Sequence, residues 1–128
     1  MAMIRFITAK FDVSVERRNP INPIPGESLL LWLAGKASPK AAISVPRAED
    51  WGWYSLVEWS GRQYMLGSSA SPEGDEYEWV LQIDKHRSLV EKLLGRERML
   101  SDDPCARFFQ QLLEEEPSFK GVVVDLAR

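Results

Sequence analysis

One histidine and one cysteine limit the chemistry that this chain can perform. A structural zinc site needs four nitrogen or sulfur ligands, which His86 and Cys105 cannot supply. A histidine-centred mechanism would have to use His86, for which Asp84 and Ser88 are the polar neighbours in sequence. Cys105 lies on the apolar stripe of an expected helix, where an inert buried thiol is common, although a helix N-terminus nearby favours activation. The sequence contains no nucleophile elbow, phosphate-binding glycine loop or H-E-x-x-H motif, so no cofactor or metal is expected.

Negative charge is concentrated in one stretch of the chain. Residues 49–84 contain eight acids and one arginine, a net charge of −7, whereas the whole chain carries −3. Such a stretch is a poor partner for nucleic acid, because phosphates require a basic surface. It permits a basic protein surface or a cationic ligand. The sequence S-P-E-G-D-E-Y-E within it lacks the spacing of an EF-hand, which favours a solvated acidic loop over a Ca²⁺ site.

The same stretch holds seven of the thirteen aromatic residues. Most of these rings are expected to pack under helices, but seven are more than one sheet face of this size hides. A tryptophan beside carboxylates suits an arginine or lysine of a partner, through cation–π and charge-assisted contacts. The candidate partner- or ligand-binding residues are therefore Glu49, Asp50, Trp51, Trp53, Glu73, Asp75, Glu76, Tyr77 and Trp79.

Strand geometry separates this candidate surface from the histidine. A predicted antiparallel meander places Glu49 and Asp50 at the start of one strand and His86 after another, at the opposite end of the sheet. A strand of about seven residues spans roughly 23 Å, too far for a hydrogen bond. The same geometry predicts that the loop from Glu73 to Glu78 converges with Glu49 and Asp50.

Apolar periodicity predicts the elements that carry these residues. Period-2 alternation predicts strands at Met3–Val15 and Glu76–Asp84. The turn signal Ser60-Gly61 predicts a hairpin of Gly52–Trp59 and Arg62–Ser68, followed by a second turn region at Ser69–Asp75, and a final strand is predicted at Phe119–Leu126. Helices are predicted at Glu27–Ala34, ending at Gly35, and from Asp103 and Pro104 to Pro117. Between them a helix is predicted from Ser88, which has capping-box spacing to Glu91, as far as Gly95, although Asp84 could cap an earlier start. Its apolar stripe is Leu89, Val90, Leu93 and Leu94. The loop between Lys36 and Ala48 has a short extended piece at Ala42–Val45.

The order β-α-β-β-β-α-α-β indicates an α+β fold. We expect a two-layer sandwich, with a mostly antiparallel sheet and helices packed on one face. A chain of 128 residues suits one domain, 1–128. The N-terminus lacks the uninterrupted apolar region of a signal peptide, and the longest apolar run, Leu29–Ala34, is too short to cross a membrane. A single cysteine excludes an intrachain disulfide framework and fits a reducing compartment. A cytoplasmic location away from the membrane is therefore expected.

Two short motifs carry a resemblance. P-I-P-G-E-S-L-L-L-W-L at Pro23–Leu33, followed by E-D-W-G-W-Y at Glu49–Tyr54, resembles small bacterial proteins of families with no assigned function. The chain is also similar in size and style to immunity proteins of bacterial toxin systems. The resemblance rests on these two short motifs and implies no catalytic residue.

Three functions follow as hypotheses. The first is a non-enzymatic interaction domain, immunity-like or regulatory, that presents the acidic, tryptophan-bearing end of the sheet to a basic protein partner. The second is a small-ligand binding domain with a tryptophan-lined pocket. The third is a hydrolase that uses His86 and Asp84. Homodimerisation through an exposed edge strand is left open.

Overall fold

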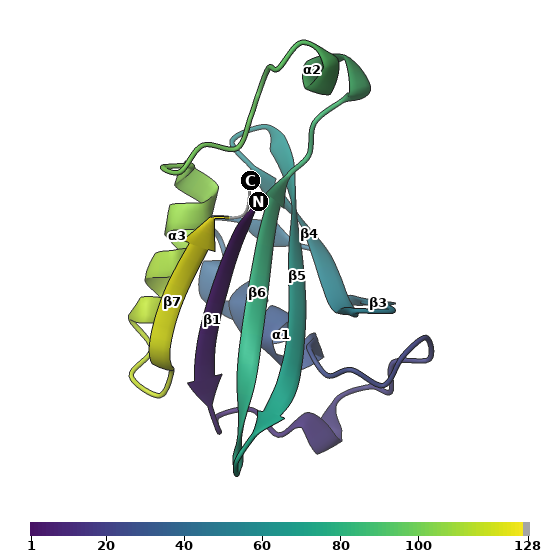
Figure 1. Cartoon of the computed structure of the whole chain (residues 1–128), viewed down its shortest axis with the longest axis vertical. Helices are drawn as coiled ribbons and strands as arrows, with labels where there is room; N and C mark the ends of the chain where they lie inside the picture. The colour runs from purple at the N-terminus through teal and green to yellow at the C-terminus, as the bar shows by residue number, and fades with distance from the viewer. Residues whose placement is uncertain (127–128) are drawn as a thin grey trace.

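Seven antiparallel strands form a single open sheet (Figure 1). The structure is a computed structural model that describes residues 1–126. The strand order is β2-β4-β5-β6-β1-β7, and β3 also pairs with β4. The bounds are β1 (Ala2–Thr8), β2 (Ala42–Ile43), β3 (Arg47–Glu49), β4 (Gly52–Trp59), β5 (Arg62–Glu73), β6 (Glu76–Lys85) and β7 (Lys120–Leu126). The α+β class and the mostly antiparallel sheet are thus confirmed.

Helices α1 (Glu27–Ala37) and α3 (Pro104–Glu114) lie on the same side of the sheet (Figure 1). Between them and the sheet lies the core, which takes alternate residues of each strand because successive side chains point to opposite faces. Its largest fully buried side chains include Trp79, Phe6, Phe109, Leu29 and Leu66. The face that points away from these helices is called the open face below.

The hairpin between β4 and β5 forms where local turn chemistry predicts it. Ser60 and Gly61 have φ angles of 49° and 77°, and Trp59 pairs with Arg62 across them. Two successive residues with positive φ define the tight turn that matches the twist of paired strands, and glycine adopts this conformation without steric cost. The register of this hairpin decides which residues share the open face.

The predicted first strand is wrong beyond Thr8. β1 ends there, Lys10 N–H donates to the Thr8 hydroxyl at 3.0 Å, and Asp12 caps the short 3-10 helix η1 (Val13–Val15). The alternation from Ala9 to Val15 therefore does not reflect sheet pairing. Phe11 instead turns toward the core, where its ring lies 5.0 Å from that of Trp79.

The predicted turn at Ser69–Asp75 is also wrong in extent, because β5 continues to Glu73 and the turn itself is Gly74-Asp75. Pro72 is tolerated inside this strand since β4 pairs with β5 only as far as Ser68. Beyond that point one edge of β5 is free of the β4 ladder, and a proline at an edge breaks no ladder hydrogen bond.

Two helices also differ from expectation. α1 runs through Gly35 to Ala37, and a Cβ at Gly35 would meet nothing within 4 Å, so this glycine is a surface position and not a stop. Helix α2 (Leu89–Leu93) has the predicted capping box, but it stands away from the sheet (Figure 1). Its predicted apolar stripe, Leu89, Val90, Leu93 and Leu94, is exposed there.

The order of elements agrees in part with the prediction. The short strands β2 and β3 are additional, although β2 falls inside the extended piece expected at Ala42–Val45. No helix among the described residues is both long enough and apolar enough to cross a membrane.

Candidate functional site

Trp51 lies in the two-residue turn that joins β3 to β4. Glu49 pairs with Gly52 across this turn, and Gly52 has φ +146°, a value that favours glycine. A Cβ on Gly52 would also lie only 2.4 Å from the Ser68 carbonyl oxygen. The short W-G-W sequence therefore lets the turn pack closely against β5 while Trp51 projects over the sheet.

The buried side chain of Asn19 holds this turn in place. Its Nδ2 donates to the carbonyl oxygens of Glu49 and Gly52, both at 2.9 Å, while its Oδ1 accepts from the N–H groups of Ile21 and Asn22. Asn22 in turn donates to the carbonyl of Asp50 at 2.8 Å. The proline-rich connection before α1 thus positions the turn by hydrogen bonds to its backbone.

The connection itself is anchored by two glutamates. Glu16 accepts from the N–H groups of Gly26 and Ser28 at the start of α1, at 3.0 and 2.8 Å. Glu27, which is buried, forms an ion pair with Arg17, and the Arg17 guanidinium lies 5.2 Å from the centre of the Trp53 ring. These contacts keep Asn19 beside the turn even though the connection has no regular secondary structure.

The ring of Trp51 rests on Gly67 of β5. A Cβ at Gly67 would lie 2.7 Å from Cη2 and 2.9 Å from Cζ3 of Trp51, closer than any ordinary contact. Tyr54 and Gln82 are the cross-strand neighbours of Gly67 on its two sides. Glycine therefore provides the space that the indole occupies, and Trp51 remains 36% exposed.

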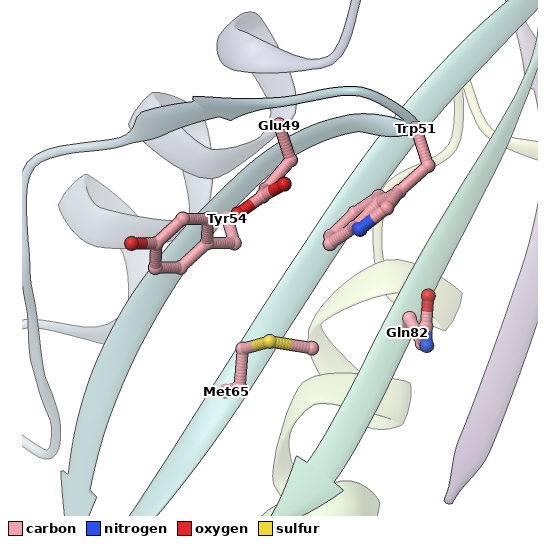
Figure 2. Close-up of a pocket in the computed structure, with 5 residues that line it drawn as sticks. All are labelled: Glu49, Trp51, Tyr54, Met65 and Gln82. Carbon is pink, nitrogen blue, oxygen red and sulfur yellow. The ribbon is translucent and has the colours of Figure 1, made fainter.

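A hollow of about 440 Å³ lies beside the indole on the open face. It is lined by Glu49, Trp51, Tyr54, Met65 and Gln82, with the Glu49 carboxylate between the two rings in the view of Figure 2. Within the described part of the chain, the Glu49 side chain forms no hydrogen bond or ion pair. Two aromatic rings around an unpaired carboxylate are the features that bind organic cations.

A second hollow of about 270 Å³ lies on the other side of Trp51. Glu78 supplies its carboxylate, and Ile24 and Val80 are its larger apolar lining residues. Trp51 therefore separates two shallow depressions, each with one acid.

The open face as a whole is acidic. Among residues 1–126, cross-strand register assigns seven acids and three bases to it, and Lys120 is paired with Glu76. The acids are Glu49, Glu58, Glu73, Glu76, Glu78, Asp84 and Asp125, and the bases are Arg5, Arg47 and Lys120. The negative stretch seen in the sequence thus spreads over this sheet face.

The structure does not bring together all of the residues that the sequence grouped as a site. Trp53 and Trp79 are buried in the core, and Tyr77 is half-buried against it. Glu73 and Asp75 lie at the tip of the β5–β6 hairpin, which extends past the end of β4 (Figure 1). Glu73 is five residues beyond Ser68, the last partner of β4, or about 16 Å along the strand. Only Glu49, Asp50 and Trp51 of the predicted set therefore lie at the β3–β4 turn.

Three residues of the hollow were missing from the sequence-based site. Tyr54, Met65 and Gln82 come from three strands, and only the register shows that they surround Gly67. The alternation of β4 does predict that Tyr54 points away from Trp53, and this was the available signal for the open face. Nothing local in the sequence links Asn19 to the turn.

His86 and Cys105 lie outside this site. His86 is exposed and follows the end of β6, at the end of the sheet opposite the β3–β4 turn, as the strand geometry predicts. Cys105 is fully buried, and burial together with the charge of Asp103 raises the pKa of its thiol to about 12. The described residues contain no group of three or more side chains arranged to hold a metal ion.

Comparison of the chain with protein-family models, with curated proteins and with solved structures gives no match.

Proposed function

We propose that this protein is an interaction domain, immunity-like or regulatory, that binds a basic side chain of a partner protein in the hollow beside Trp51. The observation that carries the proposal is the Glu49 carboxylate between Trp51 and Tyr54 on an acidic face, which has no hydrogen bond or ion pair to the residues that the structure describes. An arginine in this hollow would stack on a ring and donate to the carboxylate. Arginine is suited to this role because its planar guanidinium makes both contacts at once.

The surrounding surface supports a protein as the partner. Seven acids and three bases on the open face would attract a basic surface over a distance and orient it before contact. The hydrogen bonds from Asn19 fix the turn in advance, so little conformational freedom is lost when the partner binds. The second hollow, beyond Trp51, offers a place for a neighbouring side chain of the same partner.

The proposal can be tested with a minimal cationic probe. An acetylated Gly-Ser-Arg-Ser-Gly peptide, titrated into the ¹⁵N-labelled protein, should shift the Trp51 indole N–H signal with a dissociation constant of about 1 mM. The signal is assigned by its loss in Trp51→Phe. Glu49→Gln should weaken binding about tenfold, since it removes the charge but keeps the shape.

Glu58→Gln is the matched control, because Glu58 shares the open face but does not line the hollow. Glu58→Gln should change the dissociation constant by less than about twofold from the wild-type value, because a single distant charge is screened by salt. Equal weakening by both substitutions would reduce the hollow to one part of a general acidic surface. A Gly-Ser-Gln-Ser-Gly peptide that bound as well as the arginine peptide would refute the proposal.

A small cationic ligand is the second candidate function. A volume of about 440 Å³ falls within the range of small-molecule sites, and two aromatic rings with a carboxylate suit a quaternary ammonium group. Titration with tetramethylammonium distinguishes the two. Binding much tighter than that of the arginine peptide would favour the small ligand, whereas equal or weaker binding would favour a protein partner.

A further inference from the structure

The segment between β6 and α3 carries an exposed apolar cluster at the end of the molecule. Residues 86–100, called the arm below, include helix α2 and stand off the end of the sheet (Figure 1). Five of its aliphatic side chains are between 59% and 77% exposed. They are Leu89, Val90, Leu93, Leu94 and Leu100. Clusters of this kind on a protein surface mark interaction sites.

The arm is fixed to the body of the protein by defined contacts. Arg62, beside the β4–β5 turn, forms two hydrogen bonds with the Glu91 carboxylate, both at 2.9 Å. Lys85 pairs with Glu97 at 2.8 Å, and Ser88 and Glu91 complete the capping box of α2. An apolar surface that is held in place in this way is available to a partner without first being ordered.

These contacts leave the outer surface of the arm basic. The arm contains four bases and two acids, and both acids, Glu91 and Glu97, are paired with Arg62 and Lys85 at its base. Lys92, Arg96 and Arg98 are exposed, and their side chains have no hydrogen bond or ion pair to the described residues. A complementary partner would therefore be acidic and would offer apolar contact area.

The open face of this same chain has that chemistry. It carries an excess of acids, the hollow with Glu49 and Trp51, and Leu56, which is 40% exposed. The arm cannot reach the hollow of its own chain. It is tied to Arg62 at one end of β4, whereas Trp51 precedes the other end, about 23 Å away along an eight-residue strand.

We propose that the arm of one copy docks on the open face of a second copy, with a base of the arm in the Glu49 hollow and its leucines near Trp51 and Leu56. The inference rests on the proposed function, since it names the basic partner of that site. Two different surfaces meet in this contact, so it is heterologous: it closes into a ring if the rotation allows and otherwise builds chains of copies.

Sedimentation velocity on the full chain, from about 1 µM to about 1 mM, tests this directly. Wild type should associate as concentration rises, and added salt should weaken the association, because the contact joins opposite charges. Two variants each disable one side: Leu89→Asp with Leu93→Asp for the arm, and Glu49→Lys for the face. Each should weaken association at least about tenfold. Val15→Asp, at a residue 77% exposed and outside both surfaces, should not.

Mixing the two disabled variants gives the sharpest result. The arm variant keeps an intact face and the Glu49→Lys variant keeps an intact arm, so an equimolar mixture should form a one-to-one complex that grows no further. If the arm variant stops association while Glu49→Lys has no effect, the contact joins two arms and the inference is overturned. Thermal unfolding of every variant at the wild-type temperature would verify that each fold is intact.

Failure of this inference can be told from failure of the proposed function. A chain that stays monomeric at about 1 mM, while the arginine peptide still shifts Trp51 in a Glu49-dependent way, overturns the inference and leaves the function standing. Loss of both effects overturns both. Binding of the monomeric chain to phosphatidylglycerol vesicles, abolished in the arm variant, would assign the arm to a lipid surface and likewise overturn the inference.

Discussion

Replacing Gly67 with alanine tests how the hollow is built. The new Cβ would lie 2.7 Å from Cη2 of Trp51, whereas carbon atoms in favourable contact are about 3.5 to 4.0 Å apart. The ring must therefore move by about 1 Å or more. It is free to do so, because Trp51 is 36% exposed and the crowded atoms belong to a side chain at the surface.

The same substitution should have little effect on stability. Gly67 lies within β5 without a positive φ, so alanine is compatible with the backbone, and it gains about 0.5 to 1 kcal/mol from the lower entropy of the unfolded chain. That gain offsets part of the lost contact between Trp51 and the sheet. We expect the free energy of unfolding to change by less than about 1 kcal/mol, while arginine-peptide binding weakens at least about fivefold.

Two measurements verify this separation of binding from folding. Urea unfolding gives the change in stability, and the peptide titration monitored at the Trp51 indole gives the change in affinity. Gly35→Ala is the matched control, since its Cβ would meet nothing within 4 Å and it lies in a helix. It should stabilise the protein by up to about 1 kcal/mol and leave binding unchanged. Unchanged peptide affinity in Gly67→Ala would refute the reasoning that Trp51 must lie on Gly67 to form the hollow.

Three further predictions concern groups around the site. Asn19→Ala should lower the free energy of unfolding by about 2 to 3 kcal/mol in urea titrations, because buried backbone groups of the β3–β4 turn lose their partner; a loss below about 0.5 kcal/mol would contradict its role. The hydrogen bonds from Arg62 and from the Ser88 N–H lower the pKa of Glu91 to about 2. The contribution of Glu91 to holding the arm is therefore present above the ordinary glutamate pKa and is lost as the pH falls toward 2. In carboxyl NMR titrations, Arg62→Ala should return the pKa of Glu91 toward its usual value. The Cys105 thiol, with its pKa raised to about 12 by burial, should react with a disulfide reagent at neutral pH only after unfolding, and rapid labelling of the native protein would show that it is accessible.

Elements with local signals could be predicted from the sequence. The Ser60-Gly61 turn, the capping box at Ser88 and the Asp103-Pro104 helix start each depend on side chains within three residues of one another, and the structure contains all three. The α+β class follows from the apolar periodicities of strands and helices along the chain. These features need no knowledge of what lies across the sheet.

The rest depends on contacts between distant segments. Leu89 and Leu93 have the spacing of a buried stripe, yet both are more than 70% exposed, because α2 stands away from the sheet (Figure 1) and is attached to it through the ion pair of Glu91 with Arg62. The sequence groups Trp53 and Trp79 in the candidate binding site together with Trp51. Only the strand register assigns Trp53 and Trp79 to the core face. The extension of β5 through Pro72 separated two acidic segments that a shorter hairpin would have brought together.

The position of the bound cation tests most directly whether the hollow beside Trp51 is the binding site. Arginine labelled with ¹³C in the Gly-Ser-Arg-Ser-Gly peptide allows nuclear Overhauser contacts to be measured from its Cδ protons to the protein. We expect contacts to the rings of Trp51 and Tyr54, and we expect Glu49→Gln to abolish them. Contacts only to the hairpin tip around Asp75, or bound peptide with no contact to either ring, would contradict the claim that this hollow is the binding site.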